Sequence, residues 1–119
     1  MSKFVLIDDD KAYGLIMKKT AQTLDLELDV YESLEQMNSI GKFIHYDGVI
    51  VDYDLGSMTG VEIGQYLAAL FKELPVILIS YQYREPKEKW PQSIKGFFHK
   101  EKGHKEILSA LKTCQESAA

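Results

Sequence analysis

The stretch Val49–Glu62, with the sequence VIVDYDLGSMTGVE, decides the fold of this chain. Three β-branched apolar residues run directly into Asp52, and a second acid, Asp54, follows two positions later. Glycines and hydroxyl residues come next, and an amphipathic run begins after them. This pattern predicts a buried strand that ends in a carboxylate, then a polar loop and a helix. In an open α/β sheet, ligands bind at the carboxyl ends of the strands, which is where Asp52 falls.

The same succession of a strand and a helix recurs along the whole chain. Short apolar or alternating runs predict five strands, at Phe4–Ile7, Leu26–Tyr31, Gly48–Asp52, Val76–Ile79 and Gly96–His99. Amphipathic runs predict helices at Lys11–Leu24, from Ser33 to about Gly41, at Gly60–Lys72 and at His104–Gln115. The segment Tyr81–Ser93 contains two prolines, so the fourth helix is expected there in a short or irregular form.

The character of each strand predicts its place in the sheet. Alternating strands and helices imply a parallel sheet with helices on both faces. The first, third and fourth strands are continuously apolar and should be central, whereas the second alternates and the fifth is short, which suits edges. The predicted fold is therefore α/β and flavodoxin-like, a doubly wound (βα)5 parallel five-stranded sheet of order 2-1-3-4-5.

Local signals predict where the helices begin and which sides face the core. Asp10 suits the N-cap of the first helix, and Ser33 begins a capping box with Gln36. The apolar stripe of the first helix is expected to start with Ala12, Leu15 and Ile16. In the helix after Asp52, the residues expected to face inward are Ile63, Leu67, Leu70 and Phe71. The last helix is expected to bury Ile107, Leu108, Leu111 and Cys114.

Composition limits the class of protein. The length of 119 residues suits one domain over residues 1–119, with a single filled core. A net charge of −4 gives no basic surface for nucleic acid and disfavours anionic membranes. No apolar run approaches the roughly 20 residues of a transmembrane helix, so no membrane insertion is expected. Cys114 is the only cysteine, which excludes an internal disulfide and fits a reducing cytoplasm.

Polar residues follow four of the predicted strands at the point where each one ends. The first strand is followed by Asp8 and Asp9, the fourth by Ser80 and the fifth by Lys100. In the predicted order these strands and the strand of Asp52 are neighbours, so their tips should converge. Each of these residues, taken alone, has an ordinary alternative: a helix-capping acid, a solvated lysine or a hydroxyl bonded to backbone.

The chemistry of such a cluster favours a cation. Two carboxylates about 4 Å apart repel by about 4 kcal/mol at an effective dielectric of about 20. Oxygen ligands at an open site favour Mg²⁺. Lys100 would neutralise further charge and hold a phosphoryl oxygen, and Ser80 would donate a hydrogen bond to the same group. A metal, a cation and a hydroxyl around a carboxylate nucleophile make a phosphoryl-transfer site.

These features resemble the receiver domain of two-component response regulators over essentially the whole chain. The resemblance rests on Asp8-Asp9, Asp52 after VIV, Met58-Thr59-Gly60, Ser80 after PVILI and Lys100 after GFFH. The resemblance implies a stand-alone receiver in which Asp52 is the phosphoacceptor. It implies Mg²⁺ bound by Asp8, Asp9, Asp52 and the backbone carbonyl of Asp54, with Asp8 acting partly through water. Ser80 and Lys100 would hold the phosphoryl oxygens, and Phe97 falls where the family often has a switching aromatic residue.

The resemblance also implies the partners and the kind of activity. A histidine kinase or a phosphotransfer protein would donate the phosphoryl group, and an unknown protein would receive the signal through the region Tyr81–Lys112. The domain would assist its own phosphorylation and dephosphorylation without being a conventional turnover enzyme. It would work in the cytoplasm as a phosphoprotein.

Three positions depart from the family pattern. Gly56 stands where many members have proline, and Glu101 replaces the proline that commonly follows the lysine. Tyr81 follows Ser80 where a small residue is usual, and its ring could narrow access to Asp52 or block an inward swing of Phe97. Tyr81 is therefore a second switch candidate.

Two alternative functions remain open from the sequence. A pseudo-receiver would keep the fold as an interaction module that needs no phosphorylation; Tyr81 and Glu101 favour it, and the complete set of acids, serine and lysine opposes it. A haloacid-dehalogenase-type phosphatase would use Asp52 as nucleophile and Asp54 as general acid. That motif normally ends the first strand, and the phosphatase leaves Asp8-Asp9 unexplained.

Overall fold

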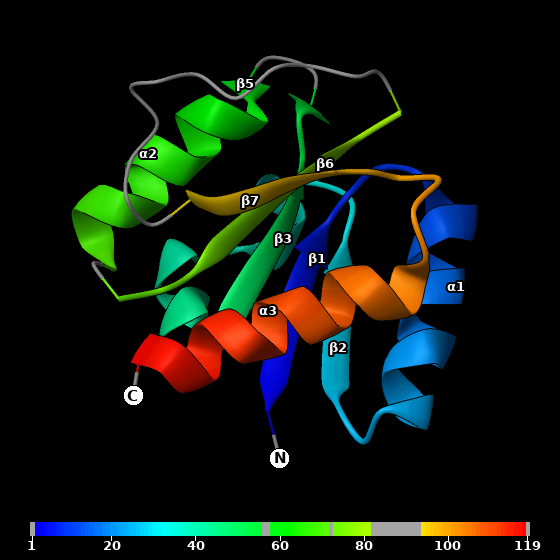
Figure 1. The fold of residues 1–119 in the computed structure, drawn as a ribbon. Coiled ribbons are helices and arrows are strands. Elements are labelled where there is room, and N and C mark those ends of the chain that lie inside the picture. The colour runs from blue at the N-terminus through cyan, green and yellow to red at the C-terminus, as the bar shows by residue number, and fades with distance from the viewer. Residues whose placement is uncertain (1, 56–57, 72, 82–93, 119) are drawn as a thin grey trace.

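The computed structural model describes residues 2–55, 58–71, 73–81 and 94–118. These residues form an α/β fold, shown in Figure 1. The first half contains β1 (Lys3–Ile7), α1 (Lys11–Thr23), β2 (Glu27–Tyr31), the 3₁₀ helices η1 (Glu35–Met37) and η2 (Ile40–His45), and β3 (Gly48–Asp52). The second half contains β4 (Asp54–Leu55), β5 (Met58–Thr59), α2 (Gly60–Leu70), β6 (Val76–Ser80), β7 (Ile94–His99) and α3 (His104–Ala118).

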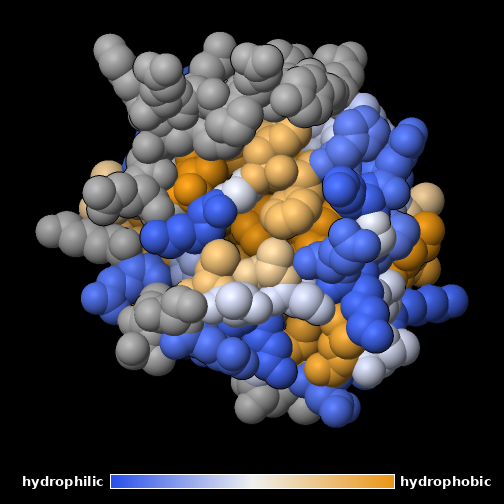
Figure 2. All heavy atoms as spheres, in the orientation of Figure 1, coloured by the Kyte–Doolittle hydropathy of each residue, from blue (hydrophilic) through white to orange (hydrophobic). Residues whose placement is uncertain are grey.

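The main sheet confirms the predicted topology. Its order is β2-β1-β3-β6-β7, and all neighbouring pairs are parallel. Every residue of β3 and β6 is buried, which explains why their sequences are continuously apolar until the terminal polar residue. The edge strand β7 is only partly buried, and Figure 2 shows hydrophobic residues gathered over it on the face that it shares with α3.

Helices cover both faces of the sheet, as Figure 1 shows. One face packs against α1 and α3 through side chains such as Met17 and Leu108. The other face packs against α2 and the two 3₁₀ helices, with Leu67 and Phe43 among its buried side chains. Within the described residues no helix covers the carboxyl ends of the strands, so loops can place functional side chains there.

Helix α1 begins as predicted but turns a different side to the sheet. The carboxylate of Asp10 accepts a hydrogen bond from the backbone N–H of Tyr13 at 3.1 Å, which confirms the N-cap. The predicted inward stripe is wrong, because Leu15 is 58% exposed, Ile16 is 48% exposed and Ala12 is also exposed. The buried residues are Tyr13, Gly14, Met17 and Ala21.

A close approach to β2 explains the orientation of α1. A Cβ atom on Gly14 would lie 2.8 Å from Cγ1 of Val30, a distance that packed side chains do not reach. The glycine therefore lets the helix lie against the strand on that side. The positions that share this side, spaced four residues apart, are then the ones that become buried.

The α-helix predicted from Ser33 does not form, and two 3₁₀ helices take its place. The capping interactions are present in part: Ser33 Oγ accepts from the N–H of Gln36 at 3.1 Å, and Gln36 Oε1 accepts from the N–H of Glu32 at 2.6 Å. Asn38 then adopts a left-handed conformation, with φ of 68°, and ends η1. Met37 and Phe43 are both buried, yet one α-helix would separate them by about 120° around its axis.

The remaining predictions for the helices are mostly confirmed. Thr59 and Glu62 form a capping box at the start of α2, and Ile63 and Leu67 are buried. Leu70 was expected to face inward but is 50% exposed, because α2 ends at this residue. In α3, the residues Ile107, Leu108 and Leu111 are fully buried and Cys114 is partly buried. The expected fourth helix falls in residues 82–93, outside the described part of the chain.

Candidate functional site

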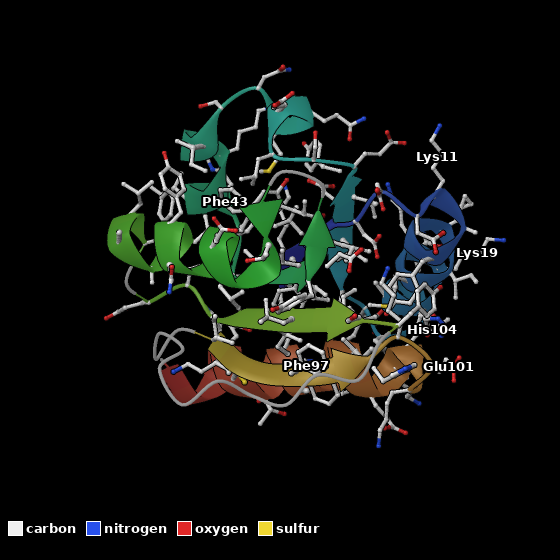
Figure 3. The ribbon with its side chains drawn as sticks, turned by 90° about the horizontal axis from the view of Figure 1, so that it is seen from above. Lys11, Lys19, Phe43, Phe97, Glu101 and His104 are labelled. Carbon is white, nitrogen blue, oxygen red and sulfur yellow. The ribbon has the colours of Figure 1, made fainter. Side chains whose placement is uncertain are left out.

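Parallel pairing brings the ends of β1, β3, β6 and β7 to one edge of the sheet, which Figure 3 views from above. The ladder continues into the loops through backbone hydrogen bonds. The N–H of Asp8 donates to the carbonyl of Tyr31 at 2.9 Å, and the N–H of Lys100 donates to the carbonyl of Ser80 at 2.8 Å. The register of the sheet therefore fixes where the residues after each strand lie.

Three carboxylates meet at this edge. One oxygen each from Asp8, Asp9 and Asp52 can be chosen so that all three lie within 4.8 Å of one another. Asp8 and Asp52 are buried, with 1% and 7% of their surface exposed, whereas Asp9 is exposed. Hard carboxylate oxygens with one open side are the donor set that Mg²⁺ prefers, so these residues fit that ion.

Lys100 joins two of the three acids. Its Nζ lies 2.6 Å from Oδ2 of Asp8 and 3.2 Å from Oδ2 of Asp52, and its side chain is 2% exposed. Burial alone would lower the pKa of Lys100, but its hydrogen bonds and charge contacts with the two acids outweigh burial and raise that pKa. The lysine therefore stays charged and offsets part of the repulsion between the carboxylates.

The loop after β1 is held by a second set of hydrogen bonds. The other oxygen of Asp8, Oδ1, accepts from the backbone N–H of Asp10 at 2.9 Å. The N–H of Tyr13 donates to Asp10 and lowers the pKa of Asp10, against a smaller opposing effect of burial. Both oxygens of Asp8 are thus engaged, one by the lysine and one by its own loop.

The structure places some of the remaining predicted residues and leaves others outside what it describes. Ser80 ends β6 and is 1% exposed, at the same edge as Lys100. Asp54 begins β4, a short strand antiparallel to β5 that the sequence did not predict, and its side chain lies outside what the structure describes. Gly56 lies outside the described residues as well. Glu101 is exposed, and its N–H donates to Nδ1 of His99 at 3.1 Å.

The two switch candidates have different surroundings. The ring of Phe97 packs edge-on against the ring of Tyr53, with centroids 6.4 Å apart and planes at 73°. It belongs to the partly buried residues on the α2 face of the sheet (Figure 3). Tyr81 is 52% exposed, and its hydroxyl donates to Oδ2 of Asp10 at 3.1 Å.

Sequence reasoning missed one residue of the site, Tyr13. Its ring centroid lies 4.9 Å from Nζ of Lys100, and the centroid of Tyr81 lies 4.7 Å from the same atom. Burial, with the nearby charge of Asp8 as the next cause, raises the pKa of Tyr13. The predicted N-cap at Asp10 was the available signal, because it places Tyr13 in the first turn of a helix that starts at the acidic edge.

The structure combines a doubly wound parallel sheet with an acidic cluster and a lysine at its carboxyl edge. This combination of fold and site is typical of one class of signalling domain. The family model described as response regulator receiver domain matches residues 4–112. The chain therefore belongs to the receiver domain family of two-component response regulators. Receiver domains are signalling domains that interact with histidine kinases or phosphotransfer proteins, and generally they are not conventional enzymes.

Solved structures share the fold at low sequence identity. The response regulator TrrA from Thermotoga maritima, in complex with Mg²⁺ and BeF, superposes with a TM-score of 0.81 at 21% identity, covering 96% of this chain and 99% of that one. A CheY-like receiver domain protein from Methanospirillum hungatei gives 0.84 at 14% identity, with coverages of 99% and 96%. The non-phosphorylated HemR receiver domain from Leptospira biflexa gives 0.81 at 17% identity, with coverages of 97% and 94%.

No match was found among curated protein sequences. Within the described residues, every helix is too short or too polar to cross a membrane.

Proposed function

We propose that this chain accepts a phosphoryl group on Asp52 from a histidine kinase or a phosphotransfer protein. The observation that carries the proposal is the cluster itself. The carboxylates of Asp8, Asp9 and Asp52 lie within 4.8 Å of one another, and the ammonium of Lys100 lies against two of them. This combination supplies a nucleophile, a cation site and a fixed positive charge at the open edge of the sheet.

The transfer follows from the roles of these groups. A carboxylate oxygen of Asp52 attacks the phosphorus of a phosphohistidine; the new P–O bond forms as the P–N bond breaks, and the histidine nitrogen keeps the electron pair. Lys100 and Ser80 bind the phosphoryl oxygens, where negative charge is spread in the transition state. Asp8, Asp9, Asp52 and the carbonyl of Asp54 would hold Mg²⁺, which would supply charge neutralisation.

The phosphorylated domain then signals by changing conformation. Phe97 lies on β7 and Tyr81 directly follows β6, and they are the residues that we expect to rearrange. The output passes to an unknown protein partner through the region Tyr81–Lys112, of which residues 82–93 lie outside the described part of the chain. A single free cysteine, Cys114, fits the reducing cytoplasm in which we place this activity.

Intact mass spectrometry tests the proposal. The purified protein is incubated with acetyl phosphate and Mg²⁺, beside Asp52→Ala and a control, Asp25→Asn. Asp25 is an exposed acid with a φ of 56°, a conformation that asparagine tolerates, so the control keeps the fold while removing an unrelated carboxylate. The wild type and the control should gain one phosphoryl group only with Mg²⁺, and Asp52→Ala should gain none. Equal labelling of Asp52→Ala would contradict the assignment.

One observation favours the pseudo-receiver as a second candidate. Lys100 pairs with Asp8 and Asp52, and the ring of Tyr81 lies over its ammonium, so the lysine that would bind the phosphoryl group is already engaged. Absence of both labelling and Mg²⁺ binding in the wild type would favour this candidate. The phosphatase hypothesis is not retained, because Asp52 ends β3, the third strand along the chain, and the chain belongs to the receiver family.

A further inference from the structure

Two tyrosines from different parts of the chain contact the ammonium of Lys100. Tyr13 comes from the first turn of α1 and is 3% exposed, whereas Tyr81 follows β6 directly. Their ring centroids lie 4.9 and 4.7 Å from Nζ of Lys100. The two rings also meet each other, with centroids 6.5 Å apart and planes at 73°. The ammonium therefore contacts both carboxylates and aromatic rings.

The physical effect of the rings is to attract and shield this charge. A cation near the face of an aromatic ring is attracted by the quadrupole of the ring, and the attraction grows when water is excluded. Lys100 is 4% exposed, so its contacts with the rings are made out of water. The ring of His104, at the start of α3, packs 5.4 Å from the ring of Tyr13 and supports it from a further side.

One carboxylate accepts hydrogen bonds from both tyrosine residues. Asp10 accepts from the hydroxyl of Tyr81 through Oδ2 at 3.1 Å. Through Oδ1 it accepts from the backbone N–H of Tyr13, also at 3.1 Å. The backbone N–H of Asp10 in turn donates to Asp8, which pairs with Lys100. These contacts join the loop after β1, the two tyrosines and Lys100 in one network.

The hydroxyl of Tyr13 shows which part of that side chain matters. Its oxygen is buried, and it has no hydrogen-bond partner within the described residues. A buried hydroxyl without a partner opposes folding. The favourable contribution of Tyr13 therefore comes from its ring, through the core of the α1 face and through Lys100.

We propose that Tyr13 and Tyr81 form an aromatic clamp that positions Lys100 for phosphoryl transfer to Asp52. The inference rests on the proposed function. A lysine carries a compact charge on a flexible stem with several rotatable bonds, so its position must be fixed by contacts. The clamp fixes that position before the donor binds. The lysine side chain therefore loses less conformational entropy when the transition state forms. Both tyrosines are positioning residues, because they act on the phosphoryl group through Lys100.

The contact itself is tested without donor or metal. Protons over the faces of aromatic rings are shifted upfield in NMR spectra, so the ε-methylene signal of Lys100, assigned with Lys100→Met, reports on the clamp. The variants are Tyr81→Ala, which removes a ring, and Tyr81→Phe, which keeps it. Tyr66→Ala is the matched control, because Tyr66 is similarly exposed but lies on α2 beside Leu34 and Ile40. The upfield shift should be reduced only in Tyr81→Ala.

The effect on transfer is then measured as the phosphorylation rate at saturating acetyl phosphate and Mg²⁺. Loss of a partly desolvated cation–π contact of about 1.4 kcal/mol corresponds to about a tenfold slower reaction in Tyr81→Ala. Tyr81→Phe should stay within about threefold of the wild type, since it loses only the hydrogen bond to Asp10. Tyr66→Ala should match the wild type.

The outcomes test the aromatic clamp and the proposed function separately. A reduced NMR shift with a slower rate in Tyr81→Ala supports the clamp. An unchanged shift, or a reduced shift with an unchanged rate, overturns it. An equal loss of rate in Tyr81→Phe also overturns it, because the ring would then be unimportant. A wild type that shows the shift but is never phosphorylated rejects the proposed function, and the positioning role with it, while leaving the ring contact demonstrated.

Discussion

The ammonium of Lys100 lies 2.6 Å from Oδ2 of Asp8, and both side chains are almost completely buried. This ion pair stands at the centre of the acidic edge, and Asp8 is also one of the three acids that can surround a cation. The lysine and a bound divalent ion would therefore neutralise the same carboxylates. Stability, metal affinity and phosphorylation should be linked through this one contact.

Replacement of Lys100 by methionine tests that link. Methionine keeps most of the volume but removes the charge, which leaves Asp8 and Asp52 uncompensated. Removal of one partner from a buried ion pair costs about 3 kcal/mol or more, so Lys100→Met should lower the free energy of unfolding by about that amount without metal. Urea unfolding measures this change. The exposed Lys19→Met is the control and should change stability little.

Added Mg²⁺ should stabilise Lys100→Met more than it stabilises the wild type. The ion would restore the positive charge that the variant lacks, and a ligand that binds only the folded state raises the free energy of unfolding. Urea titrations at several Mg²⁺ concentrations measure the difference. A larger stabilisation of the wild type would show that lysine and metal do not share the carboxylates.

The raised pKa of Lys100 predicts how this contribution depends on pH. A lysine whose pKa is higher in the folded state than in the unfolded state stabilises the fold fully below its ordinary pKa of about 10.4. That contribution is lost as the pH rises through the raised value. The difference in unfolding free energy between wild type and Lys100→Met should therefore be constant from pH 7 to about pH 10 and shrink above it. A difference that shrinks at lower pH would contradict the assignment.

Substitution of Gly14 tests whether its packing against β2 determines the orientation of α1. Alanine at an exposed helix position is favoured over glycine by about 1 kcal/mol, but here its Cβ would meet Val30 at 2.8 Å. Overpacking costs about 1–3 kcal/mol, so Gly14→Ala should lower the thermal midpoint. Leu15→Ala, at the neighbouring exposed position, should change it little. A higher midpoint for Gly14→Ala would show that α1 moves away from β2 without cost.

The sheet could be predicted because its central strands are buried on both faces, and only continuous apolar runs suit that environment. The candidate site followed from the sheet, since the order of the strands determines which tips are neighbours. Asp8, Asp52 and Lys100 needed no further information. Tyr13 could not be assigned in this way, because its place depends on the rotation of α1, which the contact between Gly14 and Val30 determines.

In the segment after β2, tertiary packing overrides the local capping signals that predicted an α-helix. Ser33 and Gln36 make capping hydrogen bonds as their sequence predicts, but those bonds organise only one turn. Burial of both Met37 and Phe43 in the same core requires the chain to change direction at Asn38. The apolar pattern already showed that Met37 and Phe43 would lie on different sides of a single α-helix. The prediction gave more weight to the capping box than to this pattern.

Asp10 offers the last prediction, since it caps α1 and holds Tyr81 at the same time. Asp10→Ala removes both interactions, and the loss of the N-cap alone should lower the free energy of unfolding by about 1 kcal/mol. Asp10→Asn keeps an oxygen for the cap but loses the negative charge, so at pH 7 its free energy of unfolding should fall between those of the wild type and Asp10→Ala. The lowered pKa of Asp10 means that its contribution is present above its ordinary pKa, near 4, and is lost as the pH falls through the lowered value. Urea unfolding from pH 7 down to about pH 3 should therefore show wild type and Asp10→Ala converging only at the acidic end. Convergence near neutral pH would mean that the carboxylate of Asp10 stabilises neither the helix nor Tyr81.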